Sequence, residues 1–166
     1  MKVLRFNHGR LGISDGAKVI DVTEQFGGEQ WPPVGVNRLI RDFAQHRARF
    51  EEMLASEEGV PLEVVRLETP VPWPNKLMAY PVNYHDHAKE MASKGLASVQ
   101  GYFLKANSSL VGPQDEIELP ALPGREVHHE CEIALIIGKQ GRQIAPEDAH
   151  HCHGNAGGRG QGPARG

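Results

Sequence analysis

Hydrophobic residues in the first seventy positions follow two periods, and each period predicts a different element. Short apolar stretches at 3–6, 11–13 and 18–21 predict β-strands, and Asp15-Gly16 suits the tight turn of a hairpin between the last two. Apolar side chains then recur at helical spacing and predict an amphipathic helix over about 36–55. Residues 62–67 are interpreted as one more strand, so residues 1–70 form a small α+β domain.

A proline-dense stretch follows this domain. Its sequence is Thr69-Pro70-Val71-Pro72-Trp73-Pro74, and three prolines there can neither continue a helix nor donate to a sheet. It is interpreted as a linker to a second domain, over residues 71–149. The pattern beyond it predicts a buried strand at 76–80, a helix at 84–94 that ends at Gly95, and strands at 102–105, 117–119 and 127–137.

The last of these predicted strands carries the most informative pair of residues. Side chains two apart on a strand share a face, so Glu130 and Glu132 would project together, roughly 6.5 Å apart along the chain. Two carboxylates at that spacing repel each other unless a positive charge lies between them. Their oxygens suit Mg²⁺, Mn²⁺ or Ca²⁺, although two ordinary acids on a solvent-facing strand give the same pattern.

The helix predicted over residues 84–94 carries a second candidate. His87 and Glu90 are three apart and share a helix face. A carboxylate beside an imidazole can orient it and raise its basicity, which suits a general base acting on water. The polar face of an ordinary amphipathic helix is the alternative.

Two further groups could contact ligands. Lys105 ends an apolar strand, where it could hold an anionic substrate oxygen or be a surface lysine. The run His150-His151-Cys152-His153 carries ligands that suit Zn²⁺, Ni²⁺ or Cu²⁺. It is too compressed for a tetrahedral site on its own and is interpreted as an adventitious metal-binding tail.

Composition narrows the class of protein. The 166 residues carry a net charge of −3 and no extended basic run, which argues against a nucleic-acid partner. No apolar stretch approaches the roughly 20 residues of a membrane-spanning helix, and the start of the chain does not resemble a secretory signal. Its two cysteines do not make a disulfide framework. The expected location is the cytoplasm.

Several segments, taken in order, resemble the fumarylacetoacetate hydrolase (FAH) family. They are Asn83-Tyr84 with His87 and Glu90, Phe103-Leu104-Lys105, Ser109-Leu110-Val111-Gly112-Pro113, Ile117-Glu118-Leu119-Pro120, and the stretch from His129 to Lys139. Their order and spacing extend the resemblance over about residues 77–149, and residues 1–70 are similar to the accessory domain of many members. The implied fold is α+β and mostly β: a small α+β domain followed by an incomplete FAH-like mixed β-roll.

The resemblance implies metal-dependent chemistry on small 2-oxo or β-dicarbonyl acids. Glu130 and Glu132 would bind Mg²⁺ or Mn²⁺, His87 and Glu90 would act on water or a substrate proton, and Lys105 would contact a carboxylate substrate. Members hydrolyse carbon–carbon bonds, decarboxylate, or interconvert keto and enol forms through an enolate held on the metal. A homodimer is usual in the family and stays an option here.

The end of the chain departs from the family pattern. The family's third ligand, an aspartate, is expected soon after the strand with the two glutamates, yet no acid follows Asp148. Positions 150–166 contain no Val, Ile, Leu, Met, Phe, Tyr or Trp, so disorder is expected there. Gly, Ala, Arg and Pro fill 11 of these 17 positions, as is typical of GC-rich codons read out of frame. A shifted reading frame in a GC-rich gene is the hypothesis for this region. A non-catalytic fragment or small binding module is the alternative to an enzyme impaired in this form.

Overall fold

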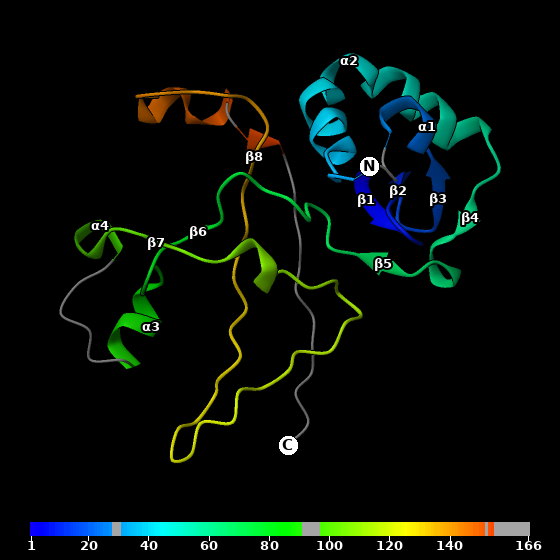
Figure 1. Cartoon of the computed structure of the whole chain (residues 1–166). Helices are drawn as coiled ribbons and strands as arrows, with labels where there is room; N and C mark the ends of the chain where they lie inside the picture. Colours follow the sequence, from blue (N-terminus) through cyan, green and yellow to red (C-terminus); the bar gives the residue numbers. More distant parts are fainter. Residues whose placement is uncertain (28–30, 91–96, 152, 155–166) are drawn as a thin grey trace. The chain divides into compact units, whose positions relative to one another are not determined.

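The computed structural model describes residues 1–27, 31–90, 97–151 and 153–154, and Figure 1 traces their elements. For residues 87, 88, 90, 97, 98, 150, 151, 153 and 154 it describes the backbone alone. The chain divides into two compact units, Met1–Val71 together with Val111–Gly166, and Pro72–Leu110.

An antiparallel sheet organises the N-terminal part of the first unit. Its strands lie in the order β4-β3-β2-β1-β5, and they are β1 (Lys2–Phe6), β2 (Arg10–Ser14), β3 (Lys18–Asp21), β4 (Val60–Pro61) and β5 (Leu67–Glu68). The three strands predicted at the start of the chain are therefore confirmed. In the hairpin turn, the Asp15 carboxylate accepts the N–H groups of Lys18 and Ala17, which lowers the pKa of Asp15.

Two helices cover one face of this sheet. The predicted helix is confirmed as α2 (Gly35–Ser56), and the short α1 (Thr23–Phe26) precedes it. Because apolar residues recur at helical spacing, α2 buries Val36, Leu39, Phe50 and Met53 on one side. They pack with strand and α1 side chains in one hydrophobic core, with Leu11, Ile13, Ile20, Val22 and Phe26.

The strand predicted over residues 62–67 is wrong except at its last residue, Leu67, where β5 begins. A 3₁₀-helix, η1 (Leu62–Val64), lies between β4 and β5. The reason is a second apolar cluster, which contains Leu4, Phe6, Val19 and Val65, with Leu62 packed against it. Residues three apart fall on opposite faces of a strand but on the same side of a 3₁₀-turn. The turn therefore brings both Leu62 and Val65 to the cluster.

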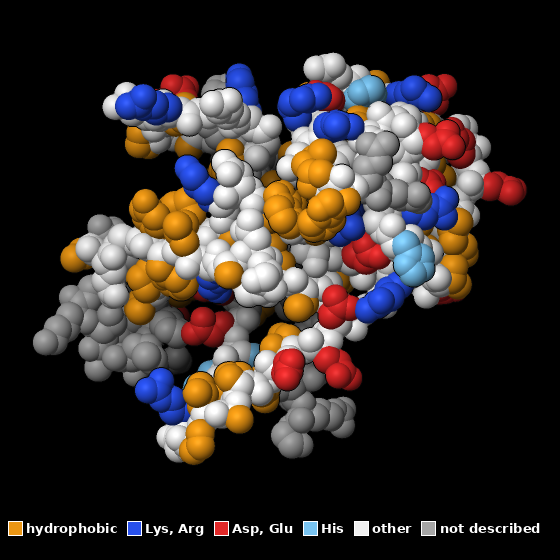
Figure 2. Space-filling model, viewed as in Figure 1, with side chains coloured by type: hydrophobic (Ala, Val, Ile, Leu, Met, Phe, Trp, Pro, Cys, Tyr) orange, Lys and Arg blue, Asp and Glu red, His pale blue; other side chains and the backbone are white. Residues whose placement is uncertain are grey.

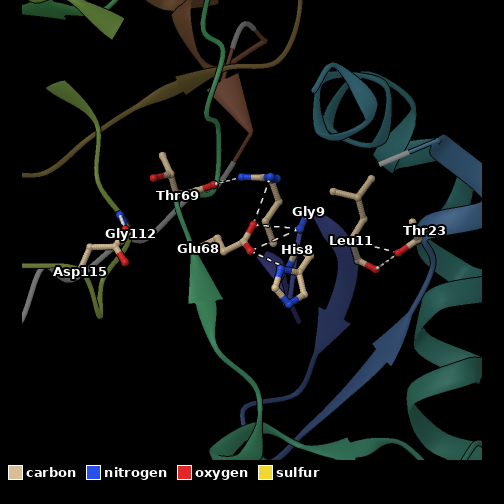
Figure 3. Close-up of polar contacts among 9 residues, drawn as sticks. His8, Gly9, Leu11, Thr23, Glu68, Thr69, Gly112 and Asp115 are labelled. Atoms are coloured by element: carbon tan, nitrogen blue, oxygen red, sulfur yellow. Dashed lines mark hydrogen bonds and ion pairs between the residues drawn. The ribbon is translucent and has the colours of Figure 1, made fainter. Parts of the chain in front are cut away.

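One partly buried carboxylate fixes the edge strand β5. Glu68 pairs with Arg5 at 3.1 Å and accepts the backbone N–H groups of His8 at 2.7 Å and Gly9 at 3.1 Å (Figure 3). The Arg5 guanidinium also donates to the carbonyl of Thr69 at 3.0 Å. Only 11% of the Arg5 side chain and 24% of the Glu68 side chain are exposed. The pair thus holds β5, the β1–β2 turn and the start of the proline-dense stretch together.

The second unit, Pro72–Leu110, has little regular structure among its described residues. It contains β6 (Met78–Ala79), α3 (His85–Glu90), α4 (Ala97–Gln100), β7 (Phe103–Leu104) and η2 (Asn107–Ser109). β6 and β7 pair antiparallel, so the strands predicted around 78 and 104 are confirmed in shorter form. The expected burial of the first is wrong, because Met78 and Tyr80 are exposed. The helix predicted over 84–94 begins as α3, and residues 91–96 lie outside the described part.

The long strand predicted over residues 127–137 is wrong except at its end. In the described part of the chain only β8 (Ile136–Ile137) is a strand there, paired with β9 (His153–Gly154), and the strand predicted at 117–119 is also missing. A strand needs a neighbour for its N–H and C=O groups, and a local pattern does not supply one. Ile133, Leu135 and Ile137 are 76%, 69% and 63% exposed. Figure 2 shows hydrophobic side chains exposed along residues 117–127 as well, at the bottom of the view.

The rest of the C-terminal stretch contains η3 (Pro146–His151). The predicted disorder of 150–166 falls mostly on residues outside the described part, namely 152 and 155–166. No described helix has both the length and the apolar character that crossing a membrane requires. The α+β fold class predicted from the sequence is confirmed in its coarse form.

The core around α2 generates a first prediction. Phe50 is fully buried and lies against Phe26 and Phe43, so Phe50→Ala should lower the free energy of unfolding by about 3–5 kcal/mol. Chemical denaturation followed by circular dichroism measures this. Val64→Ala, at an exposed position, serves as the control and should change it by less than about 0.5 kcal/mol. A Phe50→Ala variant as stable as the control would contradict the assigned core.

The Arg5–Glu68 pair generates a second prediction. Glu68→Ala leaves a partly buried guanidinium and two backbone N–H groups without their acceptor, so it should cost about 2–4 kcal/mol. Glu51→Ala removes the exposed Arg47–Glu51 pair on α2 and should cost less than about 1 kcal/mol. Denaturant titration of both variants tests the contrast. Equal losses would show that Glu68 does not hold β5.

Candidate functional site

The two glutamates predicted as metal ligands lie in the first unit. Glu130 and Glu132 are exposed, in the stretch that precedes β8. Nε2 of their neighbour His128 lies 3.4 Å from a carboxylate oxygen of Glu126, and both side chains are exposed. The side chains of Glu130 and Glu132 are likewise exposed, and neither residue lies in a strand in the described part of the chain.

The chemical type of these two ligands suits a divalent cation, but two ligands are too few to enclose one. Acidic oxygens are the donors that Mg²⁺ and Mn²⁺ prefer. Among the residues that the structure describes, however, no group of three or more His, Cys, Asp or Glu side chains gathers closely enough to hold a metal. A chelating site at Glu130 and Glu132 thus needs ligands beyond those that the described residues bring together.

Lys105 lies in the second unit, at the end of β7. Its backbone N–H donates to the carbonyl of Leu77 at 2.9 Å, which continues the β6–β7 ladder by one residue. The side chain is exposed, and its Nζ lies 5.8 Å from the centre of the Phe103 ring. The backbone is therefore held while the ammonium group stays accessible, as contact with an anionic substrate requires.

His87 and Glu90 lie in α3 of the same unit. The structure describes the helical backbone that carries them, and their side chains lie outside the described residues. On the same helix, Lys89 pairs with Asp86 at 3.1 Å, and both are exposed. The helix predicted to carry the pair is thus present, and the proposed contact between imidazole and carboxylate stays a prediction.

The predicted site residues are divided between the two units. The second unit carries His87, Glu90 and Lys105, whereas the first carries Glu130 and Glu132. The predicted transition-metal tail begins in η3 and includes β9, while Cys152 and the side chains of its three histidines lie outside the described residues.

Comparison with known proteins finds one matching family model and several similar proteins. The model of the fumarylacetoacetate (FAA) hydrolase C-terminal domain matches residues 76–152. Maleylpyruvate hydrolase from Aquipseudomonas alcaligenes is 37% identical over 161 residues, which cover 89% of this chain and 56% of that protein. The chain belongs to the fumarylacetoacetate hydrolase family. The segments that carried the resemblance in the sequence lie almost wholly within the matched residues.

Solved structures agree with this membership. A crystal structure of maleylpyruvate hydrolase from Sphingobium sp. SYK-6, in complex with manganese(II) and pyruvate, matches with a TM-score of 0.79 and 48% identity. That match covers 92% of this chain and 55% of the Sphingobium chain. A human mitochondrial oxaloacetate tautomerase is 40% identical over 90 residues, which cover 54% of this chain and 28% of that protein. The chain thus spans about half the length of the maleylpyruvate hydrolases that it matches.

Proposed function

We propose that this chain acts in the divalent-metal-dependent hydrolysis of a carbon–carbon bond in small acylpyruvates, which are both 2-oxo acids and β-dicarbonyl compounds. The supporting observation is its 48% identity, over 92% of its length, to a maleylpyruvate hydrolase whose structure contains manganese(II) and pyruvate. Pyruvate is the shared half of every acylpyruvate. A site that accommodates it suits this substrate class.

Keto–enol tautomerisation of a 2-oxo acid is the second candidate function. It is supported by the human oxaloacetate tautomerase, but that likeness covers 54% of this chain. Likeness to the two maleylpyruvate hydrolases covers 89% and 92% of it, and so includes most of the N-terminal sheet. The wider match favours hydrolysis over tautomerisation.

Two carboxylates and one ammonium group would define the substrate position. Glu130 and Glu132 would hold a divalent cation, which would stabilise the negative charge that develops on the substrate oxygens. Lys105, exposed at the end of β7, would attract the substrate carboxylate. An ammonium and a cation together suit a ligand with acidic and carbonyl oxygens close to each other.

His87 and Glu90 of α3 would activate the water that attacks the substrate. Glu90 would orient the His87 imidazole, which would take a proton from water as that water attacks the outer carbonyl carbon. The bond between that carbon and the pyruvyl methylene then breaks, and its electron pair leaves with the pyruvyl part as an enolate. A proton returned to the methylene carbon completes pyruvate and a carboxylic acid.

Metal affinity gives a third prediction. Two carboxylates without further ligands should bind Mn²⁺ with a dissociation constant on the order of millimolar, because such ions keep their waters unless several ligands are preplaced. Glu132→Ala should weaken it at least tenfold. Water-proton relaxation of residues 1–166 with added Mn²⁺ measures both values, and Glu126→Ala is the control nearby. A micromolar site that survives Glu132→Ala would refute this pair of ligands.

Turnover gives a fourth prediction. With Mn²⁺, residues 1–166 should cleave an acylpyruvate slowly, and chelation by EDTA should abolish the activity. His87→Ala should lower kcat by about 10²–10⁴-fold as expected for loss of a general base, and Lys105→Met should raise KM. Lys89→Met, an exposed lysine on α3, should change neither. Pyruvate release can be coupled to lactate dehydrogenase. A folded chain with no metal-dependent turnover would support the non-catalytic alternative.

A further inference from the structure

A turn from the family segment docks on the edge strand β5. The Arg66 N–H donates to Asn7, on the β1 side. Because successive amides of a strand point in opposite directions, the Leu67 N–H points away from β1, and it donates to the side-chain oxygen of Gln114 at 2.7 Å. The Arg66 guanidinium donates to Asp115 at 2.5 Å. Gln114 and Asp115 thus occupy the side of β5 that no strand covers in the described structure.

Close packing of backbones accompanies these hydrogen bonds. The Gly112 N–H donates to Asp115 Oδ2 at 2.7 Å, and Figure 3 shows these two residues together. A Cβ added at Gly112 would lie 3.2 Å from the Glu68 Cα and 3.3 Å from the Leu67 carbonyl oxygen. Only glycine therefore fits without a shift. We call Arg66, Leu67, Gly112, Gln114 and Asp115 the β5 clasp.

The β5 clasp joins the two stretches of chain that lead into and out of the second unit. Leu67 lies just before Pro72, where that unit begins, and Gly112 lies just after Leu110, where it ends. Inside the unit the same two stretches are antiparallel. The Asn107 side-chain amide donates to the Pro74 carbonyl at 2.6 Å, and the Lys105 N–H donates to Leu77. The stretch that enters β6 and the stretch that leaves β7 thus both continue into the clasp, from the end of the ladder where Leu77 and Lys105 pair.

This ladder is too short to persist on its own. β6 and β7 pair over two residues each, and most of their side chains are exposed, whereas isolated two-stranded ribbons are marginal in water. A clasp that already brings the two stretches together reduces the chain entropy lost when the ladder forms. The ladder in turn fixes the backbone of Lys105.

We propose that Arg66, Gln114 and Asp115 are positioning residues for Lys105, acting through the β6–β7 ladder. The part that concerns substrate rests on the proposed function, because that function gives Lys105 its role. The part that concerns the ladder does not, since it can be measured without turnover. The sequence alone predicts only a turn at Gly112-Pro113-Gln114-Asp115, because Arg66, the partner of Asp115, is 49 residues away.

Amide hydrogen exchange of residues 1–166, measured by NMR, tests the clasp. Asp115→Ala removes the acceptor of both Arg66 and Gly112, so exchange of the Lys105 amide should become at least about threefold faster, while the amides of β1–β3 stay unchanged. Gly112→Ala should act in the same direction by pushing the turn away from β5. Asp115→Asn keeps one of the two acceptor oxygens that Arg66 and Gly112 use, so it should restore part of the protection. Glu51→Ala, which breaks an exposed ion pair on α2, should leave Lys105 unaffected.

Two results would overturn the proposal. In the first, the Leu67 and Gly112 amides exchange faster in Asp115→Ala while the Lys105 amide does not, so that the clasp exists without positioning Lys105. In the second, every amide of the sheet exchanges faster as well, which would make Asp115 a general stability residue.

Kinetics separate this proposal from the proposed function. If the chain cleaves an acylpyruvate, Asp115→Ala should raise KM as Lys105→Met does and leave kcat within about twofold, and Asp115→Asn should raise KM less than Asp115→Ala does. An unchanged KM in Asp115→Ala would count against the positioning role. If the wild-type chain shows no turnover, the proposed function fails, and the exchange of the Lys105 amide still decides whether the clasp holds the ladder.

Discussion

The ion pair between Arg5 and Glu68 is the contact on which the described structure most depends. β5 has two residues and pairs with β1 at Arg5 and Phe6, which is too little backbone bonding to fix an edge strand. The Glu68 carboxylate adds the amides of His8 and Gly9 to that pairing. Because charged hydrogen bonds to a partly buried carboxylate are stronger than neutral ones, they place β5. The chain continues from β5 into the proline-dense stretch and then into the second unit.

The two halves of the chain differ in how they bury hydrophobic surface. Residues 1–65 enclose two apolar clusters, which α2 and η1 complete from nearby sequence. Beyond Pro72, most described large apolar side chains are exposed, including Val99, Ile117 and Ile133. Hydrophobic burial therefore stabilises residues 1–65, while the described elements beyond Pro72 are held by short ladders and by side-chain hydrogen bonds. This difference explains why side-chain hydrogen bonds from residues 112–115 matter to the fold.

The same difference determines how much the sequence could predict. The hairpin and α2 follow from periods of two and 3.6 residues, which are local properties of the chain. The pattern at 127–137 has a strand period too, but pairing is non-local, and in the described residues the strand there is Ile136–Ile137, which pairs with β9. The Glu130/Glu132 pair and Lys105 were predicted from residue type and family resemblance; all three are exposed, and their roles stay predictions. Gln114 and Asp115 gave no signal, because their partners come from a distant strand.

The β5 clasp also bears on the relation between the family segment and the N-terminal sheet. The family model begins at residue 76, yet Gln114 and Asp115, inside the matched segment, bind Leu67 and Arg66 outside it. A segment whose own turn uses the backbone of another sheet is not independent of that sheet. The match to the Sphingobium maleylpyruvate hydrolase also extends across both parts. Residues 112–115 of the matched segment therefore depend on the N-terminal sheet for partners of their own hydrogen bonds.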